Sequence, residues 1–264
     1  MDDTLLDTSG GMDEAWDVTL AAFAPALGFD PAAMRDAIRR EATEFWRNEA
    51  EMTAWRTRLA DARRHVIELA LVSLGHGPRG AHDLSERYGH EVFERLRLFD
   101  DAIPTLEGLR AEGFRLAILT NGPADMQRAK VERFGLERYV DALVIEGVFG
   151  RGKPDREVFE HAMGATGVGS HEAWHVGDNL YADIGGARNA GIHAVWIHRD
   201  RLESPEGFVA VPDLVVAHLT DRVDALAPEA PGRERHSPQA SAASARAGLS
   251  PPGIRPCACR SPRS

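Results

Sequence analysis

Short apolar runs that alternate with helical patterns fill the second half of this chain. The apolar runs lie at residues 115–119, 142–145, 173–176, 194–197 and 214–216. The helical patterns lie between them, at about residues 106–112, 124–134, 155–165 and 178–190. Apolar runs of this length between helices are typical of parallel strands that are buried on both faces. We therefore predict an α/β domain with a Rossmann-like, doubly wound parallel sheet.

Residues 8–98 follow a different pattern, in which apolar residues recur every three or four positions. Trp16, Leu20 and Phe23 are examples, and this spacing predicts helices. Further helices are expected at residues 31–46, 54–75 and 83–97. We predict an all-helical domain at 8–98, inserted into an α/β core domain that comprises 1–7 and 99–228.

Residues 229–264 are rich in Pro, Ser, Ala, Gly and Arg and show no periodicity. Such a segment buries too little apolar surface to offset the entropy of ordering, so we predict a disordered tail. Both cysteines of the chain, Cys257 and Cys259, lie in this tail, where they cannot staple a core.

Charge and hydropathy exclude several classes of partner. The chain of 264 residues has a net charge of -10, which argues against nucleic-acid binding. No apolar stretch approaches the roughly 20 residues needed to span a membrane, and the N-terminus has no apolar secretory region. We expect a cytoplasmic protein with no nucleic-acid or membrane partner. The sequence carries no signal of its oligomeric state.

Polar motifs follow the predicted strands in a fixed order. They are Asp2-Asp3-Thr4, Thr120-Asn121-Gly122, Gly152-Lys153-Pro154-Asp155, and Gly177-Asp178-Asn179 with Asp183 beyond it. Ligands bind at the carboxyl ends of strands in open α/β sheets, so these motifs mark one predicted site. Each motif alone is as well explained by a turn, a helix cap or a solvated charge. Their common order and position argue against four such coincidences.

Taken together, these motifs resemble those of the haloacid dehalogenase-like (HAD-like) hydrolases, in the subfamily with a helical cap inserted after the first motif. The resemblance covers about residues 1–218. It implies a magnesium-dependent hydrolase of small phosphate monoesters that works through an aspartyl-phosphate. In this comparison the helical domain at 8–98 is the cap.

The resemblance also assigns roles to individual residues. Asp178, the backbone carbonyl of Asp2, and Asp183 would hold Mg2+ or its waters. The side chain of Asp2 would act as general acid and then as general base. The hydroxyl of Thr120, the backbone N–H of Asn121 and the ammonium of Lys153 would bind the phosphate, with Lys153 also beside the nucleophile.

An acid at Asp2 favours phosphate ester hydrolysis over dehalogenation, because an alkoxide leaving group needs a proton and a halide does not. A phosphomutase stays possible, because it uses the same acid. The expected partner is a small phosphorylated metabolite. A second hypothesis is a non-catalytic relative that binds a phosphorylated ligand or a partner protein. His175 is expected to be a packed core histidine.

In the family, the nucleophilic Asp stands one residue before the position of Met1, at the end of a strand in the middle of the sheet. We therefore expect Met1 to be an internal residue of a longer protein, with an apolar strand and an Asp directly before it. Without that strand, its neighbours would lose their hydrogen-bonding partner.

Overall fold

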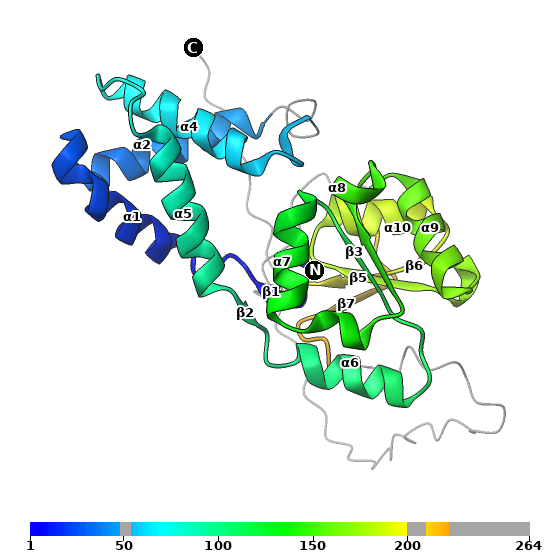
Figure 1. Cartoon of the computed structure of the whole chain (residues 1–264). Coiled ribbons are helices and arrows are strands. Elements are labelled where there is room, and N and C mark those ends of the chain that lie inside the picture. Colours follow the sequence, from blue (N-terminus) through cyan, green and yellow to red (C-terminus); the bar gives the residue numbers. More distant parts are fainter. Residues whose placement is uncertain (48–53, 200–209, 222–264) are drawn as a thin grey trace, which may run out of the picture. The chain divides into compact units, whose positions relative to one another are not determined.

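The computed structural model describes residues 1–47, 54–199 and 210–221 (Figure 1). The tail predicted at 229–264 lies outside these ranges. Within them, every helix is too short or too polar to cross a membrane.

The parallel strands fall on the apolar runs of the sequence. They are β3 (Ala117–Thr120), β4 (Ala142–Ile145), β5 (Trp174–Gly177), β6 (His193–Ile197) and β7 (Leu214–Val216). Strand β3 pairs with β4, β5 pairs with β6, and β6 pairs with β7, all in parallel. Each strand ends within one or two residues of its predicted boundary.

Helices cover both faces of these strands. They are α6 (Ala102–Ala111), α7 (Ala124–Arg133), α8 (Glu146–Phe149), α9 (Arg156–Thr166) and α10 (Gly186–Asn189), with short 3-10 turns η1 (Leu136–Tyr139) and η2 (Ser170–Glu172). Successive residues of a strand point to opposite faces. Accordingly, Leu119 packs with α9 and α10, whereas Ile118 packs with α6 and α7. The predicted doubly wound α/β fold is confirmed.

Four longer helices form a bundle of their own. They are α1 (Met12–Leu27), α2 (Pro31–Phe45), α4 (Leu59–Ser73) and α5 (Ala81–Arg95). Asp30 begins α2, because its carboxylate accepts the Ala33 N–H at 2.8 Å and Pro31 occupies the first turn. Their apolar faces share one core, which includes the fully buried Met34 and Leu84. These are the helices of the predicted cap.

Two very short strands connect the bundle to the α/β part. Strand β1 (Leu6–Asp7) pairs antiparallel with β2 (Arg97–Leu98). The chain therefore leaves the α/β part and returns to it at one place.

The helix predicted over residues 178–190 differs in the structure. It begins as a π-helical turn, η3 (Leu180–Gly185), and only then continues as α10. The carbonyl of Asn179 accepts both the Asp183 N–H at 2.8 Å and the Ile184 N–H at 3.3 Å. The wider turn places the Asp183 side chain in the interior, where it is buried. Single π turns of this kind are frequent at functional sites.

One partly buried ion pair joins the first motif to the distal strands. Arg199 donates two hydrogen bonds to Asp101, each of 3.0 Å, and a third to the carbonyl of Thr4 at 2.7 Å. Asp101 also accepts the Leu219 N–H at 2.7 Å. Burial by itself would raise the pKa of Asp101, but these hydrogen bonds and the guanidinium charge hold it below its usual value. The loop that carries Asp2 and Thr4 is thereby tied to the end of β6.

We predict that Asp101→Asn lowers the free energy of unfolding at neutral pH by about 1–2 kcal/mol, between the values for exposed and fully buried ion pairs, because it leaves Arg199 without a charged partner. The folded state favours the ionised carboxylate, so this stabilisation is fully present above about pH 4 and is lost as the pH falls further. Urea titrations between pH 7 and pH 3 measure both effects. The variant should lose less stability than the wild type over this range. Asp100→Asn, at an exposed neighbour, is the matched control, and equal slopes in all three proteins would contradict the prediction.

Candidate active site

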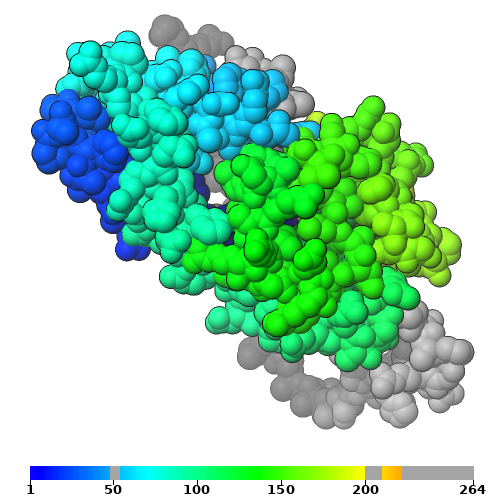
Figure 2. All heavy atoms as spheres, viewed as in Figure 1, coloured from blue at the N-terminus to red at the C-terminus, as the bar shows by residue number. Residues whose placement is uncertain are grey.

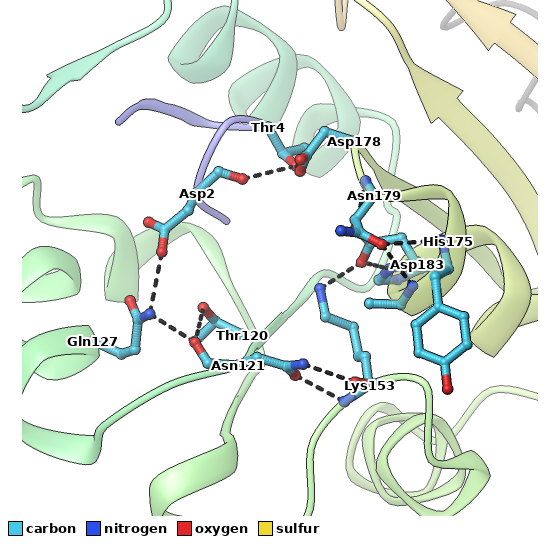
Figure 3. Close-up of polar contacts among 12 residues, drawn as sticks. Asp2, Thr4, Thr120, Asn121, Gln127, Lys153, His175, Asp178, Asn179 and Asp183 are labelled. Carbon is cyan, nitrogen blue, oxygen red and sulfur yellow. Dashed lines mark hydrogen bonds and ion pairs between the residues drawn. The ribbon is translucent and has the colours of Figure 1, made fainter. Parts of the chain in front are cut away.

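The four predicted motifs meet at the carboxyl ends of β3 and β5 (Figure 3). The hydroxyl of Thr4 donates to Asp178 Oδ1 at 2.9 Å and lies 3.4 Å from the backbone carbonyl oxygen of Asp2. The first and fourth motifs, 174 positions apart, are therefore in direct contact. Asp2 and Asp178 lie on the same side of the molecule, as the site prediction requires.

Asp178 lies in surroundings that disfavour its ionised form. It follows β5, and the indole of Trp196 fixes its backbone carbonyl through a hydrogen bond of 2.8 Å. Burial and the nearby negative charge of Asp183 raise the pKa of Asp178. A cation beside this carboxylate would relieve both effects.

Asp183 has both carboxylate oxygens occupied. Oδ1 accepts from Lys153 Nζ at 2.5 Å and lies 2.8 Å from His175 Nε2, while Oδ2 accepts the Asn179 N–H at 3.0 Å. Burial alone would raise its pKa, but the charge of Lys153 and the bond to His175 hold it far below the usual value. Asp183 therefore positions the ammonium of Lys153 and the backbone of Asn179.

His175 is partly buried and packs edge-on against the ring of Phe159, and it also contacts the site. Burial lowers its pKa and outweighs the effect of the Asp183 carboxylate. A neutral His175 is consistent with its position beside the positively charged Lys153. The prediction missed the hydrogen bond to Asp183, because the residues are eight positions apart on different elements.

Asn121 joins the second motif to the third. Its side-chain amide donates to the Lys153 carbonyl at 2.7 Å, and its side-chain oxygen accepts the Lys153 N–H at 2.7 Å. Thr120, the last residue of β3, is buried next to it. Glu146 accepts the Gly122 N–H at 3.0 Å and also pairs with Arg56. These contacts fix the loop after β3, so that the backbone N–H groups at its turn are held in place.

The Asp2 carboxylate contacts two residues that the sequence analysis did not assign. Lys130 Nζ donates to Asp2 Oδ2 at 2.8 Å, and Gln127 Nε2 donates to the same oxygen at 3.2 Å. Burial alone would raise the pKa of Asp2, whereas the charge of Lys130 lowers it, and the lowering prevails. One signal was available: of the 31 Lys and Arg residues, only Lys130 and Lys153 are lysines.

The backbone nitrogen of Met1 is also part of this cluster. It is buried, and the charges of Lys153, Asp2, Asp183 and Asp178 all act on it.

Comparison with known proteins links this geometry to a family. The sequence profile of the haloacid dehalogenase-like hydrolases matches residues 1–191. A phosphoserine phosphatase of Thermus thermophilus is 41% identical over 160 residues, which are 60% of this chain and 63% of that enzyme. The match spans less than two thirds of that relative's length.

Solved structures give the same relationship. A HAD phosphatase from Thermococcus onnurineus has a TM-score of 0.59 and 27% identity, with 86% of this chain and 94% of that chain covered. A 2-haloacid dehalogenase from Pseudomonas syringae has a TM-score of 0.58 and 28% identity over the same shares of the two chains. Similarity of fold therefore extends to both phosphatases and dehalogenases.

We predict that Gly177→Ala disturbs the site by displacing Asp183. A Cβ at Gly177 would lie 2.2 Å from Asp183 Cγ, so the carboxylate would have to leave Lys153 and His175. Overpacking of this kind costs about 1–3 kcal/mol of unfolding free energy, measurable by urea denaturation. Gly164→Ala is the matched control, because a Cβ there meets open space within α9. It should leave stability unchanged or raise it by up to about 1 kcal/mol. Equal effects at both positions would refute the steric argument.

Proposed function

The profile of the haloacid dehalogenase-like hydrolases covers most of the chain, so this protein belongs to that family. On that premise we propose that it hydrolyses small phosphate monoesters with Mg2+. The observation that carries the proposal is the contact of Asp2, Thr4 and Asp178 beside the buried ammonium of Lys153. A dianionic phosphate needs positive charge and hydrogen-bond donors from the protein at such a place.

The residues present fit a magnesium ion. The carboxylate of Asp178 and the backbone carbonyl of Asp2 both lie against the Thr4 hydroxyl, and Mg2+ prefers oxygen ligands of this kind. In the described residues no group of three or more His, Cys, Asp or Glu side chains could hold a metal. The proposed site therefore uses one carboxylate, one backbone carbonyl and the substrate, with Asp183 in a supporting position. When bound, Mg2+ would neutralise charge on the phosphate oxygens.

The phosphate would be held from the opposite side by the second and third motifs. Lys153 supplies a point charge whose position Asp183 fixes. Thr120 supplies a hydroxyl, and the backbone N–H of Asn121 supplies a second donor at the start of the turn after β3. The side chain of Asn121 is committed to the Lys153 backbone, so the backbone group is the one proposed to contact the phosphate.

We place the nucleophilic carboxylate on a residue directly before Met1. The buried position of the Met1 nitrogen supports this placement. A second feature supports it independently: among the described strands, β3 and β5 do not pair with each other. A cavity of about 280 Å³ is lined by residues of both, including Ile118, Leu119, His175 and Val176. The mostly apolar lining of this cavity is compatible with an apolar strand that runs between them and ends in Asp.

Asp2 would then complete the reaction through its side chain. The charge of Lys130 favours the ionised Asp2, whereas a bound phosphate dianion would favour its protonated form. In that form Asp2 would give a proton to the ester oxygen as this oxygen leaves phosphorus. As water attacks the aspartyl-phosphate, the Asp2 carboxylate would take a proton from that water. A halide needs no such proton, so Asp2 favours the phosphatase reaction over dehalogenation. The alternative is a protein that binds a phosphorylated ligand without turnover, which retains Thr120, Lys153 and Asp178 as its site.

A phosphatase assay with a panel of phosphorylated metabolites tests the proposal. It compares residues 1–264 with a protein extended upstream by the adjoining coding sequence. Activity that needs the upstream Asp, and that disappears when this Asp is changed to Asn, is the expected result. Binding of phosphorylated ligands without turnover in both proteins would establish the alternative instead.

We further predict that Asp178→Asn weakens Mg2+ binding and reduces activity at least about 100-fold, because even supporting residues at metal sites contribute on the order of 10- to 100-fold. Binding of Mg2+ should raise the melting temperature of the wild type, and the variant should lose this shift. Asp155→Asn, which removes a partly exposed carboxylate from the third motif's loop, controls for loss of charge. A full Mg2+ shift in the Asp178 variant would exclude the proposed metal site.

A further inference from the structure

Helix α7 presents two buried polar side chains to Asp2. Lys130 and Gln127 are one turn apart, and both bind the same oxygen, Oδ2, at 2.8 Å and 3.2 Å. In Figure 1 the N-terminus lies beside α7, and in Figure 2 the green atoms of this part of the chain form the outer surface in that view. The ammonium of Lys130 points toward Asp2, because it donates a hydrogen bond to Oδ2 and the residue is buried.

Several observations distinguish Lys130 from a surface charge. The residue is 7% exposed and Gln127 is 1% exposed. Among the described residues, Asp2 is the one carboxylate that pairs with Lys130. Gln127 is itself held, because its amide also donates to the Asn121 carbonyl at 2.7 Å. Other basic positions of the chain are overwhelmingly Arg, so a lysine here suits a compact charge that must fit a small space.

The other carboxylate oxygen of Asp2, Oδ1, has no such contacts in the ranges that the structure describes. Within the described part of the chain, Oδ1 is buried and has no hydrogen-bond partner. A buried acceptor without a partner costs about 1–3 kcal/mol, so this oxygen is available to a hydrogen-bond donor such as water or a substrate group. Of the two Asp2 oxygens, Oδ2 is therefore hydrogen-bonded to side chains of α7, whereas Oδ1 has no hydrogen-bond partner among the described residues.

We infer that Lys130 and Gln127 are positioning residues that hold Oδ2 of Asp2 and direct Oδ1 toward the reacting oxygen. The inference rests on the proposed phosphatase function. It requires no change at Oδ2 during the reaction, because Oδ2 accepts hydrogen bonds whether or not Oδ1 carries a proton. The same contacts therefore keep one orientation through both steps, in which Oδ1 gives its proton to the leaving oxygen as the P–O bond breaks and later takes a proton from the attacking water. The charge of Lys130 favours the ionised carboxylate, so its part in the first step is to orient Asp2.

If the pair of Lys130 and Asp2 had only a structural role, a different result would be expected. Loss of such a pair weakens the fold and lowers activity equally for every substrate. Loss of a positioning residue matters most where proton donation is needed, which is when the leaving group is a poor one. Alkyl phosphates have poor leaving groups, whereas p-nitrophenyl phosphate releases a stabilised phenolate that needs little help.

The experiment measures kcat/KM for a series of phosphate esters, because this parameter reports the step in which the ester bond breaks. It uses whichever protein form is active in the assay proposed above. Lys130→Met should lower kcat/KM for alkyl phosphates on the order of 100-fold, the lower range of general acid catalysis, and should change the p-nitrophenyl phosphate value little. Asp2→Asn sets the reference pattern for loss of the acid. Lys130→Arg, which keeps the charge and the donors, should recover part of the loss.

The matched control is Arg128→Met on the same helix, at an exposed position, which should leave the series unchanged. Circular dichroism checks folding, and Lys130→Gln replaces the Met variant if that variant is unfolded. Crystal structures add a readout that needs no activity: in Lys130→Met the Asp2 carboxylate should rotate from its wild-type orientation.

A uniform loss across the series, or an unchanged Asp2 orientation, would overturn the inference and leave the proposed function intact. Absence of phosphatase activity in every form would instead defeat the proposed function, and the inference with it.

Discussion

The buried carboxylate of Asp183 is the contact on which the arrangement of the site depends. It binds the ammonium of Lys153, which follows β4, and the imidazole of His175, which belongs to β5. It also caps the backbone of Asn179. Ion pairs this deeply buried contribute little net stability, but removal of one partner is costly. Asp183 therefore fixes the positions of loops that the strands alone would leave free to differ.

The polar network extends from Asp183 around the whole site. Asn121 and Lys153 bind each other's loops, Gln127 connects Asn121 to Asp2, and Thr4 connects Asp2 to Asp178. Figure 3 shows these side chains arranged around a common centre. Each motif is thus hydrogen-bonded directly or through Gln127 to another motif, which explains physically why the four occur together in one sequence.

Sequence periodicity was sufficient to predict the fold, because the buried faces of strands and helices require apolar residues at regular spacings along the chain. It located the second and fourth motifs for the same reason, since each of them directly follows an apolar run. It could not reveal Lys130 or Gln127, because their partner lies more than 120 positions away. It also missed the π turn at 180–185, which depends on a doubly used carbonyl at Asn179 and not on hydrophobic spacing. Contacts of this kind follow from the folded geometry.

The distribution of lysine has a practical consequence. Both side-chain primary amines of the chain, at Lys130 and Lys153, are buried in the site, while the other cationic side chains are guanidinium groups. Reagents that acylate lysine amines would thus find no exposed lysine on the described surface. Slow acylation of Lys130 or Lys153 would therefore measure how often the interior of the site opens to solvent. The two buried lysines can thus serve as chemical probes of transient opening of the site.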